Sequence, residues 1–183
     1  MPTAADRTLV TGFLAFAGFP INPSALLAES CGRRFHLLEV AYDAVDAFIA
    51  DLDPQRFDRL LMLGVAGHST RMRLEQVARN RTGGRRDVRN YSPFADAVAI
   101  DPAGADLLHG TLWTACPTLL SETSYCRASD DAGDYLCNYI YYRALSRFGG
   151  THAVGFLHVP PLEAIDLPTQ QRLLAEILKA IEA

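Results

Sequence analysis

Apolar runs of strand length alternate with helix-like segments along the first third of the chain. The runs at residues 8–11, 35–40 and 60–63 are each long enough for a buried strand. Between the first two, Asn22 and Pro23 predict a helix start, with asparagine as the N-cap and proline in the first helical position. Between the second and third, Asp43 is expected to cap a helix whose apolar side chains share one face: Val45, Phe48, Ile49 and Leu52. This alternation predicts an α/β sheet with largely parallel central strands.

The remaining pattern is irregular in the middle of the chain and regular again at its end. Residues 72–75 alternate like a strand, residues 79–93 are polar enough for a long loop, and residues 102–120 are expected to be helical. A β-like run at 123–128, a helix through about Phe148 and an apolar strand at 153–159 follow. A last helix, from about Thr169, buries an apolar face. We therefore expect one three-layer α/β/α domain over residues 1–183, with a mixed, centrally parallel sheet.

Composition narrows the classes of function. Of the 183 residues, 49% are hydrophobic and 21% charged, which is typical of a folded domain. The net charge of −4 argues against nucleic acid as a partner, and the longest apolar runs are too short to span a membrane. The four cysteines form no CxxC pair and no zinc-site spacing, and no secretory signal is found in residues 1–7. We expect a cytoplasmic protein with free thiols and without metal or cofactor.

Cys137 is the residue with the most informative position. It falls in the first turns of the helix that ends near Phe148, just past the carboxyl end of a predicted strand. Backbone N–H groups at a helix N-terminus favour the negatively charged form of a thiol, which is its nucleophilic form. A small buried core residue would fit the same position. The catalytic interpretation therefore requires a base close to the thiol.

His158 and Glu75 can complete such a site. His158 lies at the end of an apolar strand, and Glu75 is an acid in a mostly apolar stretch. In an open α/β sheet, ligands bind beyond the carboxyl ends of the strands, so residues 12–13 and 64–65, the loop before Cys137, and His158 should gather in one place. The alternative for His158 is a satisfied buried histidine, and for Glu75 an ion pair with one of the many arginines.

Four sequence blocks carry a resemblance to a known family. Residues 11–18 and 22–24 read TGFLAFAG and NPS, similar to TGF-x-PFGG…NPS, and residues 64–67 and 74–80 read GVAG and LEQVARN, similar to GQAGG…ERVA-x-N. Residues 129–138, SDDAGDYLCN, resemble S-x-x-AG-x-(Y/F)-(L/V)-CN, and residues 155–160, GFLHVP, resemble GF-(I/L)-H-(V/I)-P. The blocks span nearly the whole chain. They resemble pyroglutamyl peptidase I, also called pyrrolidone-carboxylate peptidase, a family of cysteine peptidases.

The resemblance implies an exopeptidase that hydrolyses the N-terminal pyroglutamyl residue from peptides through an acyl-enzyme. By position, Cys137 would be the nucleophile, His158 the general base and acid, and Glu75 the group that orients the imidazole. Arg85 and the backbone of Cys137 would stabilise the oxyanion, while Phe13 and Phe16 would line the pocket for the flat lactam ring. The resemblance also implies a phosphorylase/hydrolase-like fold. The family often forms homo-oligomers, although this sequence does not set their number.

Several positions depart from the family pattern. Val65 stands where the family usually has a glutamine beside the substrate; His68 replaces a glycine, Ala15 a proline and Ala17 a glycine. Because Val65 removes an amide that can hydrogen-bond a lactam, a second hypothesis is a Cys-His-Glu hydrolase of another small amide or lactam.

A third hypothesis belongs to a different class of function. A non-catalytic binding protein on the same scaffold would hold an anion with its arginine-rich loop, which contains Arg79, Arg81, Arg85, Arg86 and Arg89. In an acidic protein we favour a solvated loop as the explanation of these arginines. Helix capping similarly explains Asp130 and Asp131 without a metal site.

Overall fold

A six-stranded mixed sheet forms the centre of the computed structural model, which describes residues 7–16, 18–94, 96 and 98–183. The segment before Arg7 and the family departure at Ala17 lie outside the described residues. The strand order is β2 (Arg34–Leu38), β1 (Thr8–Phe13), β3 (Arg59–Val65), β8 (Ala153–Val159), β4 (Met72–Glu75) and β7 (Cys126–Ser129). Strands β2, β1, β3 and β8 are parallel, β4 is antiparallel to β8, and β7 is parallel to β4. The predicted mixed, centrally parallel sheet is confirmed.

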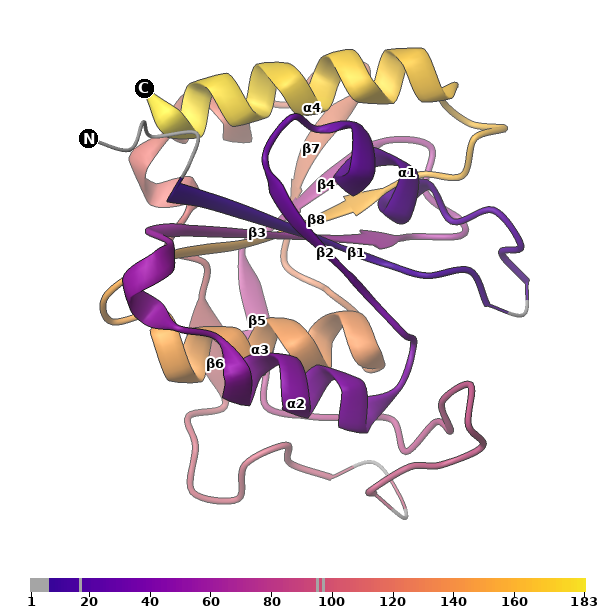
Figure 1. Ribbon diagram of the computed structural model, residues 1–183, viewed down its shortest axis with the longest axis vertical. Coiled ribbons are helices and arrows are strands. Elements are labelled where there is room, and N and C mark those ends of the chain that lie inside the picture. Colours follow the sequence, from indigo (N-terminus) through magenta and orange to yellow (C-terminus); the bar gives the residue numbers. More distant parts are fainter. Residues whose placement is uncertain (1–6, 17, 95, 97) are drawn as a thin grey trace.

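Helices cover both faces of this sheet (Figure 1). Helices α1 (Pro23–Ser30) and α4 (Leu167–Glu182) lie on one face, and α2 (Tyr42–Asp51) and α3 (Leu136–Phe148) on the other. Side chains alternate accordingly along β3: Leu61 and Leu63 belong to the core beneath α1 and α4, whereas Leu60 and Met62 belong to the core beneath α2 and α3. Two covered faces explain the unbroken apolar runs, because each fully buried side chain stabilises the fold by about 1.5–3 kcal/mol.

At the starts of α1 and α2, one predicted cap is confirmed and the other is wrong. The Asn22 side chain accepts the N–H of Ser24, and Pro23 occupies the first turn of α1. The Asp166 side chain caps α4 in the same way. The predicted cap of α2 is wrong: Asp43 lies inside the helix, and Ala41 is the N-cap. The buried N–H of Tyr42 donates instead to Asp87 of the arginine-rich loop, 3.1 Å away, so a distant carboxylate replaces the local cap.

Residues 102–120 are not helical, contrary to the prediction. Strand β6 (Leu107–His109) pairs antiparallel with β5 (Val77–Arg79), and two short 3-10 turns, η3 (Trp113–Ala115) and η4 (Pro117–Leu120), follow. Pairing with β5 satisfies the backbone of β6. Gly110 then permits a close approach, because a Cβ atom there would lie 2.0 Å from the Tyr141 hydroxyl. A third 3-10 turn, η2 (Pro54–Arg56), joins α2 to β3.

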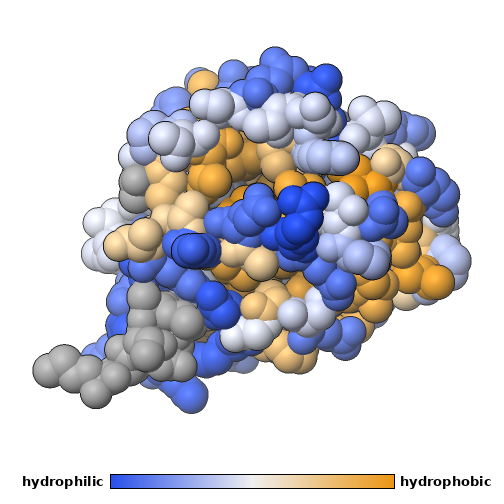
Figure 2. All heavy atoms as spheres, turned by 90° about the horizontal axis from the view of Figure 1, so that it is seen from above, coloured by the Kyte–Doolittle hydropathy of each residue, from blue (hydrophilic) through white to orange (hydrophobic). Residues whose placement is uncertain are grey.

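The outer surface on the α4 side is of mixed character. Figure 2 shows a band of hydrophilic side chains crossing the middle of this face, with hydrophobic ones on either side. Within the described part of the chain, every helix is too short or too polar to cross a bilayer.

Candidate active site

Three strand ends and one helix start enclose a cavity of ≈ 470 Å³. Strands β1, β3 and β8 are parallel, so their carboxyl ends meet at one edge of the sheet, and α3 begins at that edge. The cavity is lined by six of the seven predicted site residues: Phe13, Phe16, Val65, Arg85, Cys137 and His158. The seventh, Glu75, lies behind His158 and is fully buried. The convergence expected from strand topology is therefore confirmed.

Cys137 is the second residue of α3 and lies against the sheet. A Cβ atom added to Gly64 would be only 2.8 Å from Sγ of Cys137, so the thiol occupies space that any other residue at position 64 would fill. Gly64 pairs with His158 in the β3–β8 register, which places the imidazole beside the same point. The first-turn N–H groups of α3 have no acceptors within the helix, and the positive end of the helix dipole favours negative charge on a thiol there.

Glu75 holds His158 from the side away from the cavity. Oε1 of Glu75 lies 2.7 Å from Nδ1 of His158, and the two side chains are 0% and 7% exposed. The backbone oxygen of Glu75 accepts hydrogen bonds from Trp113 Nε1 at 3.0 Å and the Tyr141 hydroxyl at 2.8 Å. These contacts fix the strand that carries the carboxylate. Because Glu75 binds Nδ1 of His158, Nε2 remains for Cys137.

The environment of His158 favours its protonated form. Burial alone would lower its pKa, but the charge and hydrogen bond of Cys137 and those of Glu75 outweigh burial and raise the pKa to about 9. The imidazole thus carries its proton at neutral pH as one half of an ion pair. The arrangement of a thiol, an imidazolium and a carboxylate is suited to nucleophilic catalysis with proton transfer.

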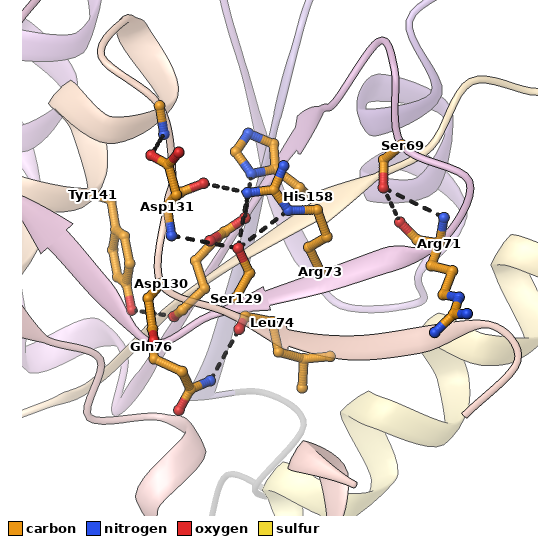
Figure 3. Close-up of polar contacts among 12 residues, drawn as sticks. Ser69, Arg71, Arg73, Leu74, Gln76, Ser129, Asp130, Asp131, Tyr141 and His158 are labelled. Atoms are coloured by element: carbon orange, nitrogen blue, oxygen red, sulfur yellow. Dashed lines mark hydrogen bonds and ion pairs between the residues drawn. The ribbon is translucent and has the colours of Figure 1, made fainter. Parts of the chain in front are cut away.

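A guanidinium connects Glu75 to the loop that precedes Cys137. Figure 3 shows Arg73, His158, Ser129 and Asp131 directed toward one another. Nη2 of Arg73 lies 3.1 Å from Oε1 of Glu75, and Arg73 also donates to Oγ of Ser129 and to the backbone oxygen of Asp131. Arg73 and His158 are cross-strand partners in the antiparallel β4–β8 pair, which brings their side chains to the same face.

Asn138 fastens the arginine-rich loop to the helix of Cys137. Its buried side chain accepts the N–H of Arg79 at 2.9 Å and donates to the backbone oxygens of Arg79 and Arg81 at 2.8 and 2.9 Å. Farther along the loop, the guanidinium of Arg85 stacks on the ring of Tyr135, 4.6 Å from its centroid. Arg85 therefore reaches the cavity at a position fixed by the start of α3.

Aromatic rings also line the cavity. Phe13 is buried at the end of β1, while Phe16 is half-buried and packs at 5.4 Å between ring centroids against Phe19, which also lines the cavity. Val65 and His68 line the same cavity. Such walls suit a flat, neutral ring better than a charged group.

Several side chains of the arginine-rich loop already have partners within the protein. Arg89 pairs with Glu39 and Asp43, Arg86 donates to the oxygen of Asn90, and Arg79 donates to the oxygen of Asp130. These partners agree with the solvated loop that we favoured over an anion site.

The two aspartates before Cys137 do not have the predicted role. The N-cap of α3 is Tyr135, without a side-chain hydrogen bond, so helix capping by Asp130 or Asp131 is wrong. Asp131 accepts the N–H of Gly133 instead, which stabilises a turn at a positive φ of 83°. The Asp131 side chain therefore shapes the loop rather than the helix.

Sequence reasoning missed the roles of Arg73, Asn138 and Phe19, and it placed Gly64 at the site without its close approach to the thiol. Asn138 and Gly64 stand inside the motif blocks, and their positions there are a usable signal. Arg73 is a polar residue in an alternating strand, which by itself predicts solvent exposure.

The sequence and the fold were compared with known proteins. The sequence model of the family described as pyroglutamyl peptidase matches residues 6–174. The pyrrolidone-carboxylate peptidase of Cupriavidus taiwanensis is 30% identical over 194 residues, covering 97% of this chain and 88% of that protein. Pyrrolidone-carboxylate peptidase 1 of Streptococcus pneumoniae is 28% identical, with 96% and 89% covered. The pyrrolidone carboxyl peptidase structure from Thermus thermophilus has a TM-score of 0.76 at 29% identity, with 96% and 98% covered. Pyroglutamyl peptidase I of Bacillus amyloliquefaciens shares the fold, with a TM-score of 0.81 at 20% identity and coverage of 96% and 95%.

Proposed function

The chain belongs to the pyroglutamyl peptidase family, and from this premise we propose that it is a cysteine peptidase that removes the N-terminal pyroglutamyl residue from peptides. One observation carries the proposal: Cys137 and His158 line the same cavity as three phenylalanine side chains, and Glu75 bonds His158 from behind at 2.7 Å. A nucleophile, a proton carrier and an apolar surface that can bind a lactam ring thus share one site.

In the first half of the reaction, the thiolate of Cys137 attacks the carbonyl carbon that joins pyroglutamate to the next residue. A C–S bond forms and the carbonyl electrons move onto oxygen. When this oxyanion collapses, the C–N bond breaks, and Nε2 of His158 gives its proton to the departing amine. The shortened peptide leaves and pyroglutamate stays on Cys137 as a thioester.

In the second half, water replaces the peptide. His158, now neutral, takes a proton from water as the oxygen attacks the thioester carbon. The C–S bond breaks, pyroglutamate is released, and the thiolate–imidazolium pair is restored. Glu75 accepts a hydrogen bond from Nδ1–H throughout, so the imidazole keeps the orientation in which Nε2 faces the sulfur.

The oxyanion is stabilised by the backbone N–H of Cys137 and by Arg85. The N–H belongs to the first turn of α3, where it has no acceptor within the helix. The position of Arg85 over the Tyr135 ring, at the same cavity, supports a guanidinium directed toward developing negative charge.

The substrate ring is held mainly by shape. Phe13, Phe16 and Phe19 support a flat ring between aromatic walls, and Val65 supplies an apolar contact where the family usually has an amide. Recognition by packing alone discriminates less strongly than recognition by paired hydrogen bonds.

An assay of arylamides with different N-terminal acyl groups tests the proposal. Under reducing conditions, wild-type protein is expected to cleave a pyroglutamyl-arylamide in preference to prolyl- and glutaminyl-arylamides. The Cys137→Ala variant should lose this activity, whereas Cys126→Ala, which alters another half-buried thiol, should keep it. No cleavage by the wild-type protein, or no preference for the pyroglutamyl group, would overturn the proposal.

A further inference from the structure

Both known contacts of the Glu75 carboxylate pass through a single oxygen atom. Oε1 lies 2.7 Å from Nδ1 of His158 and 3.1 Å from Nη2 of Arg73. The other oxygen, Oε2, is buried and has no hydrogen-bond partner among the described residues. A carboxylate removed from water in this way requires compensating charge close by. Arg73 supplies a permanent positive charge, whereas the charge of His158 changes during the proposed reaction.

The same guanidinium holds the loop that leads to the thiol. Nε and Nη2 of Arg73 lie 3.2 and 2.8 Å from Oγ of Ser129, and Nη2 also donates to the backbone oxygen of Asp131. Residues 130–135 then run directly into α3 and Cys137. The planar, five-donor guanidinium can serve these acceptors together, which a lysine ammonium with the same charge does less well.

We propose that Arg73 is a positioning residue of the peptidase reaction, holding Glu75 and the loop before Cys137 in one fixed arrangement. The inference rests on the proposed function. Arg73 acts through Glu75 and the loop, because it is absent from the described residues that line the cavity. It also influences the pKa of His158, because its positive charge neutralises part of the Glu75 charge that stabilises the imidazolium.

Several ionisable groups surround His158 and enter this balance. Strand β4 contributes Arg73 and Glu75, and helix α3 contributes Cys137 and Tyr141. The cavity walls add His68, Arg85, Asp134 and Tyr135. Removing the positive charge of Arg73 leaves the whole Glu75 charge to the imidazolium, so His158 should keep its proton to a higher pH.

Three variants test this inference: Arg73→Met, Arg73→Lys and, as a control, Arg127→Met. Arg127 is the exposed neighbour of Arg73 in the β4–β7 register. Arg73→Met is expected to lower kcat by a factor on the order of 10 to 100 with little change in KM. It should also move the alkaline limb of the pH profile upward by about half to one pH unit. Arg73→Lys should return the limb to its wild-type position and recover only part of kcat, while Arg127→Met leaves both unchanged.

The rate of Cys137 alkylation by iodoacetamide, followed against pH, gives a second measurement that needs no substrate. The same upward shift is expected in Arg73→Met. If kcat and both pH profiles match the wild-type protein, the inference is overturned. If the wild-type protein cleaves no pyroglutamyl substrate but the alkylation profile still shifts, the proposed function fails while the coupling of Arg73 to His158 stands.

A second cavity, of ≈ 590 Å³, opens beside the first and carries an independent inference. The two cavities share Gly18, Phe19, Gly67 and His68 as walls. The second is otherwise lined by apolar side chains such as Ile21 and Leu162, by Ser69 and Thr70, and by the acid Glu163. No lysine or arginine is found among the described residues that line it. A peptide whose first residue fills the first cavity must continue in some direction, and this neighbouring cavity adjoins it.

We infer that the residues following pyroglutamate lie in this second cavity, where Glu163 favours a cationic side chain over an anionic one. This inference also rests on the proposed function. Because Glu163 is exposed, the preference should be modest, about two- to fivefold in kcat/KM.

The test compares peptides that begin pyroglutamyl-Lys and pyroglutamyl-Glu. The wild-type protein should prefer the first, Glu163→Gln should lose the preference, and Glu163→Lys should reverse it. Glu176→Gln, which alters an exposed acid on α4, serves as the control with no effect. Equal rates for both peptides alongside normal arylamide hydrolysis would overturn this inference only. Absence of arylamide hydrolysis would overturn the proposed function and this inference together.

Discussion

Gly64 and Cys137 lie so close that a Cβ atom at position 64 would approach the sulfur to 2.8 Å. The same atom would meet the ring of Phe156 at 2.8 Å, so neither side offers room. Gly64→Ala should therefore displace the thiol and reduce kcat/KM at least tenfold, at a loss of about 1–3 kcal/mol in stability from overpacking. Arylamide kinetics and urea unfolding measure the two effects. Gly150→Ala is a matched control, because a Cβ atom there meets nothing within 4 Å.

The alkaline limit of activity should report His158. Because its pKa is raised to about 9, the imidazolium persists well above the usual range of histidine, and kcat/KM should fall only as the pH passes about 9. Glu75→Gln removes a charge that raises this pKa, so the limb should move to lower pH. The pH dependence of kcat/KM between about 6 and 10.5 checks both statements. A Glu75→Gln limb that stays in place or moves upward would contradict the assigned electrostatics.

The four thiols should differ in reactivity. Burial raises the pKa of both Cys31 and Cys126, so these side chains remain protonated and slow at neutral pH. Cys137, beside the His158 imidazolium, should be alkylated first by iodoacetamide at pH 7. Mass spectrometry of peptides after timed quenching measures each rate. Similar slow rates at all four cysteines would argue for a binding protein without a reactive thiol.

Asn138 should matter to stability more than to chemistry. Asn138→Ala leaves the N–H of Arg79 and two backbone oxygens without their partner, although alanine is the better helix former. We expect a loss of about 1–3 kcal/mol in the free energy of unfolding and a raised KM, because Arg85 follows the released segment. Urea denaturation and arylamide kinetics measure these effects. Gln171→Ala is the control, because it removes a side-chain amide whose hydrogen bond to Ser30 lies on the surface.

Val65→Gln should strengthen recognition of the lactam. A glutamine amide at this wall of the cavity can pair with the polar edge of the ring, which valine leaves unpaired. We expect a several-fold lower KM for a pyroglutamyl-arylamide with kcat little changed. The ratio of pyroglutamyl to prolyl cleavage measures discrimination. No gain in that ratio would indicate that shape, rather than hydrogen bonding, selects the substrate here.

Pattern reasoning succeeded where position along a parallel sheet decides the outcome. Phe13, Val65 and His158 follow apolar runs, and parallel strands necessarily bring such ends to one edge. The helix of Cys137 starts at that edge for another reason: β7 runs antiparallel to β8, and residues 130–135 lead the chain from β7 to α3. Strand order thus predicted the positions of Phe13, Val65 and His158, whereas Arg85 and Phe16 came from the resemblance carried by the motif blocks.

Prediction from the sequence pattern failed where a residue distant in the chain supplies the hydrogen-bond partner that a local residue was expected to supply. Asp43 has the composition of a cap, but Asp87 takes that function from another loop. Residues 102–120 contain apolar residues at helical spacing, yet pairing of β6 with β5 satisfies their backbone instead. Arg73 has the pattern of an exposed strand residue, and only the register of β4 against β8, in which it is the partner of His158, brings it to the site.

The attachment of the arginine-rich loop has a consequence for engineering. Asn138 holds its beginning, the Tyr42 hydroxyl donates to the oxygen of Arg85, and the Tyr135 hydroxyl donates to the oxygen of Arg86. The loop is thus anchored to α2 and to the start of α3 in addition to the hydrogen bonds within it. A chimaera that exchanges residues 79–91 with those of a relative would therefore have to exchange these three anchors as well. Without them, the exchanged loop would lack the side chains that hold it to the helices.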